Sequence, residues 1–257
     1  MLNVIAVPAF QDNYLWLLHA EGCRDCYVVD PGDAKVIEAA LESHNLELAG
    51  VLLTHHHWDH TGGVEALTEV RSIPVYGPNS PNIPQVTHAL AEGDQVSLSG
   101  GLNFTVLEVP GHTLDHIAYF NPENPALFCG DALFAGGCGR MFEGTAPQMQ
   151  ASLAKMADLP SKTQIYCAHE YTQANLRFAL AVEPENQFLV QRAAQTDRAR
   201  SAGQSTVPSE LGVELQTNPF LRWAAADVIA AASTQANRSL SNPEDVFGAL
   251  RSWKDNF

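Results

Sequence analysis

Apolar residues recur in short runs along the first two thirds of the chain, and glycine, proline, asparagine or aspartate bounds most of these runs. Short apolar runs between turn-forming residues are typical of β-strands. We therefore expect strands at Val4–Val7, Tyr14–Leu18, Tyr27–Val29, Val51–Leu53, Phe104–Val109, Ile117–Phe120, Ala126–Cys129 and Ile165–Cys167.

Helical patterns lie between some of these strands. In Ala34–His44 the apolar residues stand at positions 36, 37, 40 and 41, which places them on one face of a helix. Val64–Val70 and Gln148–Leu159 have a similar pattern. Strands and helices mixed in this way indicate an α+β fold in which helices cover sheets.

The pattern changes after Glu170, where β-branched runs become rare and helix-favouring stretches follow one another. These stretches are Ala174–Val182, Phe188–Arg200, Ala224–Ala236 and Val246–Trp253. Asn242-Pro243-Glu244 is a helix start, with a capping side chain, a proline in the first turn and an early acid. We therefore expect a main domain over residues 1–169 and a small all-helical domain over residues 170–257.

Composition and charge narrow the classes of protein and partner. The hydrophobic fraction of 46% is sufficient for a sizeable core, while the net charge of -15 repels nucleic acid and anionic membranes. No apolar run approaches the ~20 residues that a membrane-spanning helix needs. The N-terminus lacks a basic start, and the five cysteines are interpreted as reduced thiols. We expect a cytoplasmic protein that binds neither nucleic acid nor membrane.

Four of the ten histidines fall within six residues, at His55, His56, His57 and His60, with Asp59 among them. This cluster follows an apolar strand, and alternate residues of an extended segment face the same side. His55, His57 and Asp59 would then share one side, with His60 just beyond and His56 pointing away as a non-ligand. Imidazole and carboxylate groups suit zinc, iron or manganese.

Three further candidates, His112, Asp131 and His169, each follow a strand-like run. Strands that end along one edge of a sheet would bring these groups together. Five histidines and two aspartates are too many ligands for one tetrahedral site, so two metal ions that share a bridging carboxylate would account for all seven. His116 remains open between a group that supports the ligands and an ordinary polar residue.

The spacing His55-x-His57-x-Asp59-His60, followed at long intervals by His112, Asp131 and His169, resembles the signature of the metallo-β-lactamase superfamily. The resemblance implies a four-layer αββα sandwich with the metals at one edge of its two sheets. It implies that His55, His57 and His112 bind the first metal, and that Asp59, His60 and His169 bind the second. Asp131 would bridge the two.

A narrower set of motifs is similar to glyoxalase II, the hydroxyacylglutathione hydrolases. The motifs are Gly130-Asp131-Ala132-Leu133-Phe134, Gly137-Cys138-Gly139-Arg140, His169-Glu170-Tyr171-Thr172, Asn175-Leu176, Asn218-Pro219-Phe220-Leu221-Arg222 and Arg251-x-x-Lys254. In that family, equivalents of Arg140, Tyr171, Arg251 and Lys254 hold the glutathione part of the substrate. Many members carry tyrosine where this chain has Phe142, so one hydroxyl contact to the peptide is missing here.

The resemblance implies an enzyme that hydrolyses S-(2-hydroxyacyl)glutathione, chiefly S-D-lactoylglutathione, to glutathione and D-lactate in methylglyoxal detoxification. Two divalent metal ions, with zinc the first choice and iron or manganese the alternatives, would be the cofactors. His55, His57, Asp59 and Asp131 would be the catalytic residues. The expected partner is the small glutathione thioester alone, and the expected state is a monomer.

The residues by themselves leave the basic pair near the C-terminus with two interpretations. Arg251 and Lys254 are one helical turn apart, so they share a face on which both could meet one substrate carboxylate. The alternative is a solvated basic helix end that is favourable to the helix dipole.

Rival functions are another superfamily hydrolase, of other thioesters or of β-lactams, and a non-catalytic metal-binding scaffold. β-Lactam hydrolases commonly place cysteine at the position of Asp131 and lack an acid at Asp59. The chain's acidity disfavours a nuclease, and no length remains for the flavin domain of a diiron reductase. Metal analysis together with a thioester hydrolysis assay separates the enzyme from the scaffold.

Overall fold

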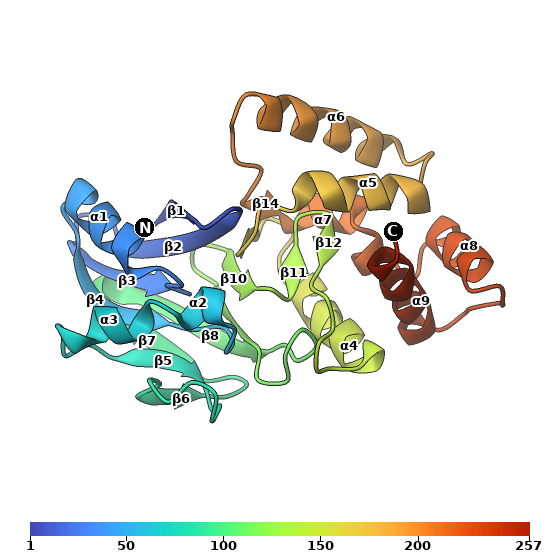
Figure 1. Ribbon diagram of the computed structural model, residues 1–257. Coiled ribbons are helices and arrows are strands. Elements are labelled where there is room, and N and C mark those ends of the chain that lie inside the picture. Colours follow the sequence, from blue (N-terminus) through green and yellow to red (C-terminus); the bar gives the residue numbers. More distant parts are fainter. The chain divides into compact units, whose positions relative to one another are not determined.

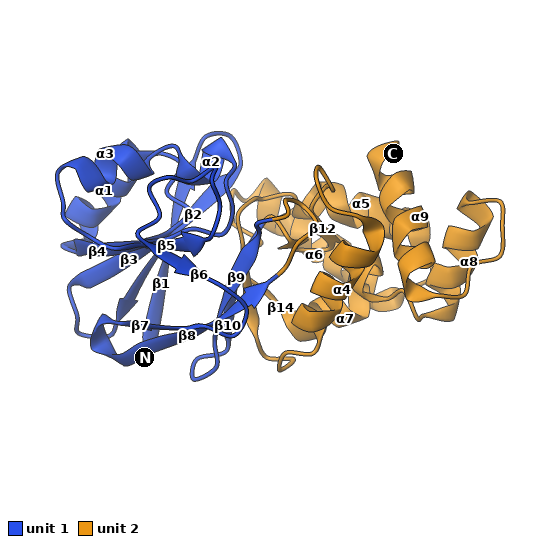
Figure 2. Cartoon of the chain, turned by 90° about the horizontal axis from the view of Figure 1, so that it is seen from below, with its two compact units in different colours: residues 1–108, 115–130 blue, residues 109–114, 131–257 orange.

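The computed structural model describes residues 1–257 and divides the chain into two compact units. Unit 1 consists of residues 1–108 and 115–130, and unit 2 consists of residues 109–114 and 131–257 (Figure 2). The chain therefore crosses between the units three times, twice around the short segment 109–114.

A six-stranded sheet forms the first half of unit 1 (Figure 1). Its strands, in spatial order, are β1 (Leu2–Ala9), β2 (Asn13–Ala20), β3 (Asp25–Val29), β4 (Glu47–Leu52), β5 (Val75–Pro78) and β6 (His88–Leu90). The first three are antiparallel, whereas β3 to β6 pair in parallel. A parallel pair needs a crossover, and α1 (Ala34–His44) supplies it between β3 and β4.

Helices cover one face of this sheet. Alternation along β2 directs Leu15 and Leu17 into one core cluster, which also contains Ile37 and Leu41 of α1. Leu67 of α3 (Val64–Glu69) joins the same cluster. Figure 2 shows α1 and α3 on one side of the β1–β6 sheet and β7 and β8 on the other.

The second group of strands in unit 1 is antiparallel. It contains β7 (Gln95–Leu98), β8 (Leu102–Glu108), β9 (Ile117–Asn121) and β10 (Ala126–Gly130), with the 3-10 turn η1 (Ser99–Gly101) between β7 and β8. Every residue of β9 and β10 is buried. Tyr119 Oη donates a hydrogen bond to the Leu53 carbonyl oxygen at 2.8 Å, so β9 packs against the end of β4.

Unit 2 is mostly helical. Its elements are β11 (Leu133–Phe134), β12 (Gly137–Cys138), α4 (Ala146–Ala157), β13 (Gln164–Cys167), α5 (Thr172–Val182), α6 (Gln187–Ser201), β14 (Ser209–Glu210), α7 (Leu211–Thr217), η2 (Pro219–Leu221), α8 (Ala226–Gln235) and α9 (Pro243–Asp255). Helices α5 and α6 lie side by side (Figure 1) and share a small core of Leu176, Ala179 and Leu189. Phe220 joins α5 to α9 because its ring packs on Phe178 and Phe247.

The predicted mixture of strands and helices, with a helical C-terminal region, is confirmed. Each of the eight expected strands overlaps an observed one, and the helix expected at Ala34–His44 has those bounds. Asn242 caps α9 by accepting from the Asp245 backbone N–H at 2.7 Å. The pattern missed β5, β6 and β7, since each has only three or four residues and β6 is largely exposed.

Candidate metal centre and substrate cavity

Four candidate ligands in unit 1 lie close together just beyond β4. The ring centroid of His55 is 4.7 Å from that of His57 and 4.1 Å from that of His60. Asp59 Oδ2 lies 3.4 Å from His60 Nε2. The side chains of His55 and His60 are fully buried, whereas that of Asp59 is 34% exposed.

The segment from His55 to His60 is not extended throughout, as strand-like alternation had predicted, because a helical turn begins within it. Helix α2 (Trp58–Thr61) begins directly after His57, whose φ of -61° and ψ of 146° end the extended stretch. Asp59 and His60 therefore project from a helical turn, and only His55 to His57 follow strand-like alternation. His56 turns away, with Nδ1 2.9 Å from Asp115 Oδ2.

The Nδ1 atoms of two unit 1 histidines are held by a buried network around Asp30. His60 Nδ1 lies 3.0 Å from Asp30 Oδ2, and His55 Nδ1 lies 3.0 Å from Thr54 Oγ1. Thr54 donates to Asp30 from its backbone N–H at 2.8 Å and from its hydroxyl at 2.7 Å. Since the hydroxyl proton goes to Asp30, Thr54 Oγ1 accepts from His55, and both rings present Nε2 to a metal.

Asp30, Thr54 and Asn13 are supporting residues that the sequence reasoning did not single out. Asn13 Nδ2 donates to Asp59 Oδ2 at 3.0 Å, which fixes the carboxylate of that candidate ligand. Asp30 directly follows β3, just as Asp131 directly follows β10. The strand-end signal that identified Asp131 could therefore have identified Asp30, whereas nothing in the sequence marks Asn13.

Unit 2 contributes the other three candidates, His112, Asp131 and His169, all buried. The Asp131 carboxylate lies between the two rings, with Oδ2 3.4 Å from His112 Nε2 and Oδ1 3.4 Å from His169 Nε2. His112 Nδ1 donates to the Arg140 carbonyl oxygen at 2.8 Å, so its Nε2 also remains available for a metal. The Asp131 carboxylate therefore directs one oxygen to each of the two histidine rings.

The spacing of these atoms fits a coordination shell better than a set of hydrogen bonds. Bonds of about 2.0–2.2 Å from zinc to nitrogen or oxygen place neighbouring tetrahedral ligands roughly 3.3–3.6 Å apart. The Asp59–His60, Asp131–His112 and Asp131–His169 pairs all measure 3.4 Å, longer than the usual range of about 2.7–3.2 Å for N–H···O bonds. The chain therefore carries groups of histidine and aspartate that are able to hold metal ions.

His116 supports the unit 1 ligands through packing. Its buried ring stacks on that of His55, with centroids 4.6 Å apart and planes 13° apart. Its Nδ1 lies 3.0 Å from the Ile117 carbonyl oxygen, which fixes the ring. The sequence left two interpretations open for His116. Its stacking on the candidate ligand His55 favours a group that supports the ligands over an ordinary polar residue.

A cavity of about 320 Å³ in unit 2 brings the expected substrate residues together. Its lining includes Arg140, Phe142, Tyr171, Arg251 and Lys254, beside the candidate ligands His112 and Asp131, and it is completed by Phe134, Cys138 and Asn175. Cationic, aromatic and metal-binding groups therefore share one cavity.

The two basic residues of α9 have different surroundings in this cavity. Arg251 is buried and donates from Nη1 to the Cys138 carbonyl oxygen at 3.1 Å and from Nη2 to Asp255 at 3.0 Å. Lys254 Nζ donates to the Ala174 carbonyl oxygen at 3.1 Å. Burial, followed by the charge of Arg251, lowers the pKa of Lys254 to about 8.

Aromatic rings border the unit 2 ligands. Tyr171 stacks on His169, with centroids 4.7 Å apart and planes 5° apart. Phe142 meets His112 edge-on at 5.3 Å and is 62% exposed. Phe142, which lacks the hydroxyl of tyrosine, therefore lies at the open side of the cavity beside the candidate ligand His112.

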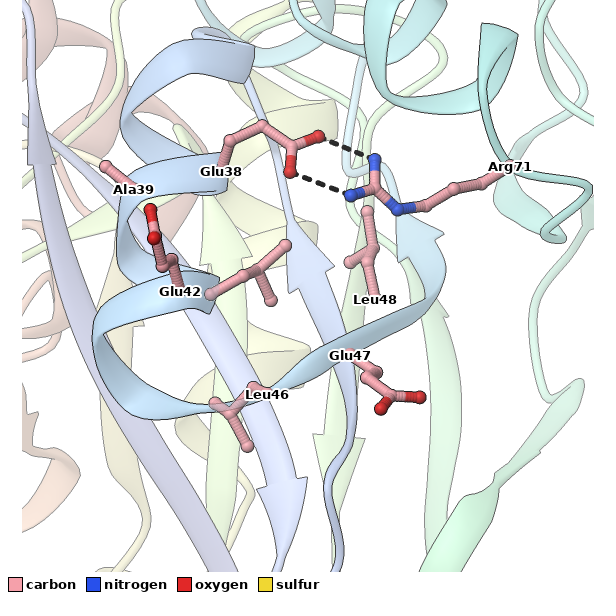
Figure 3. A pocket seen from close by; sticks show the side chains of 8 residues that line it. Glu38, Ala39, Glu42, Leu46, Glu47, Leu48 and Arg71 are labelled. Carbon is pink, nitrogen blue, oxygen red and sulfur yellow. Dashed lines mark hydrogen bonds and ion pairs between the residues drawn. The ribbon is translucent and has the colours of Figure 1, made fainter.

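A second pocket, of about 650 Å³, lies in unit 1 and contains none of the candidate ligands (Figure 3). Glu38 and Arg71 form a bidentate ion pair across it, at 2.6 and 2.7 Å. Glu47, also on its wall, pairs with Arg24 at 2.9 Å. The Glu38–Arg71 ion pair therefore links α1 to the segment just after α3.

Comparison with known proteins gives the same assignment along the whole chain. Residues 13–169 match the metallo-beta-lactamase superfamily, and residues 170–257 match the hydroxyacylglutathione hydrolase C-terminus. A hydroxyacylglutathione hydrolase of Pseudomonas aeruginosa (strain LESB58) is 52% identical over 259 residues, which cover 100% of both chains. This chain belongs to the hydroxyacylglutathione hydrolase family.

Solved structures show the fold of the family. The crystal structure of ETHE1 from Myxococcus xanthus matches with a TM-score of 0.65 at 24% identity, over 99% of this chain and 98% of that chain. The structure of TTHA1623 in a di-iron-bound form matches with a TM-score of 0.61 at 26% identity, over 85% and 100% of the two chains. The metallo-β-lactamase fold with a C-terminal helical region, expected from the motifs, is confirmed.

None of the helices combines the length and the apolar character that crossing a bilayer requires.

Proposed function

We propose that the protein is a metal-dependent thioesterase that hydrolyses S-(2-hydroxyacyl)glutathione, with S-D-lactoylglutathione as its main substrate, to glutathione and D-lactate. The observation that carries the proposal is the unit 2 cavity, where Arg140 and Lys254 lie beside the candidate ligands His112 and Asp131. An anionic substrate can meet the cations while its reacting carbonyl lies at the metal ligands. The name of the Pseudomonas aeruginosa relative supports the same reaction.

Two divalent cations are the cofactors in this proposal, with zinc the first choice and iron or manganese the alternatives. His55, His57 and His112 are assigned to the first cation, Asp59, His60 and His169 to the second, and Asp131 to both. The 3.4 Å ligand spacings support the assignment, as does the di-iron-bound form of the structural relative TTHA1623. Bound cations would supply acidification of a water molecule and polarisation of the thioester carbonyl.

The side chains of the protein perform the remaining tasks. Asp59, fixed by its hydrogen bond from Asn13, binds metal and orients the attacking hydroxide. His55, His57 and Asp131 would hold the cations that supply this chemistry. The thiolate of glutathione is a good leaving group, so the reaction requires no strong general acid.

The basic side chains that line the cavity are proposed to hold the carboxylates of glutathione. The Arg140 side chain is 60% exposed, and Lys254 Nζ donates one hydrogen bond to a backbone carbonyl oxygen. Both side chains can therefore turn toward a ligand. Arg251 is already bound to Cys138 and Asp255, and it contributes its charge and the shape of the cavity wall. Tyr171 and Phe142 flank the peptide, and Phe142 offers contact area without a hydrogen bond.

We further propose that residues 170–257 form the substrate-binding domain, beside a catalytic domain over residues 1–169. The two family matches meet at this boundary, although compact unit 2 also includes residues 109–114 and 131–169. A monomer in the cytoplasm remains our proposal for the state and location of the enzyme.

The test is an assay of glutathione release from S-D-lactoylglutathione by the metal-loaded protein, with a β-lactam offered in parallel. We expect hydrolysis of the thioester and not of the β-lactam. D131A should lose both bound metal and turnover, because the shared ligand is removed. Full activity of D131A at normal metal content would contradict the bridging role, and β-lactam hydrolysis alone would contradict the proposed substrate.

A further inference from the structure

The short β11–β12 hairpin connects two parts of the proposed site. Asp131 lies just before it and Arg140 just after it. The two ends are in tight contact, since a Cβ on Gly139 would meet the Asp131 carbonyl oxygen at 2.0 Å. Arg140 also accepts the hydrogen bond from His112 Nδ1 through its carbonyl oxygen. A shift of the hairpin would therefore move two candidate metal ligands together.

Side chains from the helical part of unit 2 hold the backbone of this hairpin. At its turn, the Gly136 N–H donates to Glu214 Oε2 at 2.8 Å. Asn218 Nδ2 donates to the Gly137 carbonyl oxygen at 2.9 Å, and Asn175 Nδ2 donates to the Ala135 carbonyl oxygen at 3.1 Å. Asn218 opens the Asn-Pro-Phe-Leu-Arg motif, for which the proposed reaction has no chemical role.

Glu214 is the centre of this arrangement. It is fully buried, and its Oε1 accepts from Arg192 Nη2 and from the Ser209 hydroxyl, while its Oε2 accepts from the Gly136 N–H and from Asn218 Nδ2 at 3.1 Å. A buried carboxylate is costly unless its oxygens are fully hydrogen-bonded. The four bonds are complete only when the Gly136 turn is in place, so the network selects one position of the hairpin.

We propose that Glu214, supported by Arg192 and Asn218, is a positioning residue for both the metal ligands and the glutathione-binding residues. It acts through the β11–β12 hairpin and touches neither substrate nor metal. The inference rests on the proposed function for its kinetic consequences, but its effect on metal affinity does not depend on the identity of the substrate.

The test compares E214Q with a matched control, E183Q. Glu183 is equally buried in the same unit and forms a bidentate ion pair with Arg222, at 2.9 Å for both bonds, without contacting the hairpin. Glutamine at position 214 replaces one accepting oxygen with a donating amide group. That group must face either Arg192 or the Gly136 N–H, so one of these two hydrogen bonds is lost. Both variants lose a buried carboxylate, and both should unfold at a lower temperature.

Only E214Q should weaken metal binding, measured as the zinc dissociation constant in competition with a chromogenic chelator. Supporting groups around metal ligands typically account for about 10- to 100-fold in affinity, and we expect a change of about tenfold for E214Q. Its KM for lactoylglutathione should also rise because Arg140 moves with the hairpin. Excess zinc should restore part of kcat but should leave KM raised. General destabilisation of the fold would not produce this difference between the two constants.

Wild-type zinc affinity and KM in folded E214Q would overturn the proposal, and so would equal losses in E183Q. If E214Q does not fold, S209A removes a single donor to Glu214 and should weaken zinc binding to a smaller extent. Unchanged zinc affinity in folded S209A would then overturn it. If wild-type protein binds zinc but does not hydrolyse lactoylglutathione, the proposed function fails while the zinc comparison still tests the positioning role.

Discussion

At the scale of single residues, protonation decides how well the cavity attracts an anion. Lys254 lies partly buried beside Arg251, and these surroundings lower its pKa to about 8. The ammonium group therefore carries its full charge well below pH 8 and loses it as the pH rises through that value. A substrate carboxylate held by Lys254 loses its partner over the same range.

We expect KM for lactoylglutathione to rise between pH 7 and 9.5 in the wild type, with a midpoint of about 8 in the free enzyme. K254R should remove this rise, because guanidinium keeps its proton throughout the range. Titration of the substrate itself affects both proteins equally, so the comparison isolates Lys254. Steady-state kinetics across this range are the measurement, and parallel KM profiles in the two proteins would refute the role of Lys254.

At the scale of elements, α9 places two of the three basic residues of the cavity, Arg251 and Lys254. The helix begins at Pro243 with Asn242 as its cap and ends at Asp255, and Lys254 adds a cation to its last turn. Phe247 packs against Phe220 between the cap and the cavity end of the helix. Because this packing remains when the cap is lost, a change at the cap alone should lower stability and leave Arg251 and Lys254 in place.

N242A removes the acceptor for the Asp245 backbone N–H, and loss of such a cap typically costs about 1 kcal/mol. The midpoint of thermal unfolding should fall by roughly 2–4 °C, which is the usual response of a protein of this size. KM should stay unchanged, since Arg251 and Lys254 are two turns or more away. N256A, at the exposed far end of the same helix, is the control and should alter the midpoint much less.

At the scale of the whole molecule, the seven candidate ligands are divided between the two compact units. His55, His57, Asp59 and His60 belong to unit 1, and His112, Asp131 and His169 belong to unit 2. Metal binding is expected to stabilise the folded protein, because a ligand that binds only the folded state stabilises it by mass action.

Removal of metal by a chelator followed by dialysis should abolish thioester hydrolysis and lower the unfolding temperature. Metal at 100 times its dissociation constant stabilises the folded state by about 2.7 kcal/mol. Return of zinc should restore both properties, as measured by circular dichroism and by glutathione release. An unfolding temperature that does not respond to zinc in protein shown to bind it would contradict this expectation.

The sequence by itself determined the classes of element, the ligand types and the family. Periodic apolar runs predict a helix at Ala34–His44 and eight strands elsewhere, because hydrophobic periodicity is a local property of the sequence. The dense cluster from His55 to His60 and the strand-end positions of His112, Asp131 and His169 are likewise visible in one dimension.

Only the tertiary structure decided which groups support these residues. Asn13 lies 46 positions from Asp59, and Asp30 lies 30 positions from His60, so sequence alone does not show which ligand each one fixes. Thr54 is next to His55, but its local pattern is that of an ordinary polar residue. The contact between Glu214 and Gly136 spans 78 positions. Hydrogen bonds of this kind depend on the folding of remote segments onto one another, a three-dimensional property that periodicity does not encode.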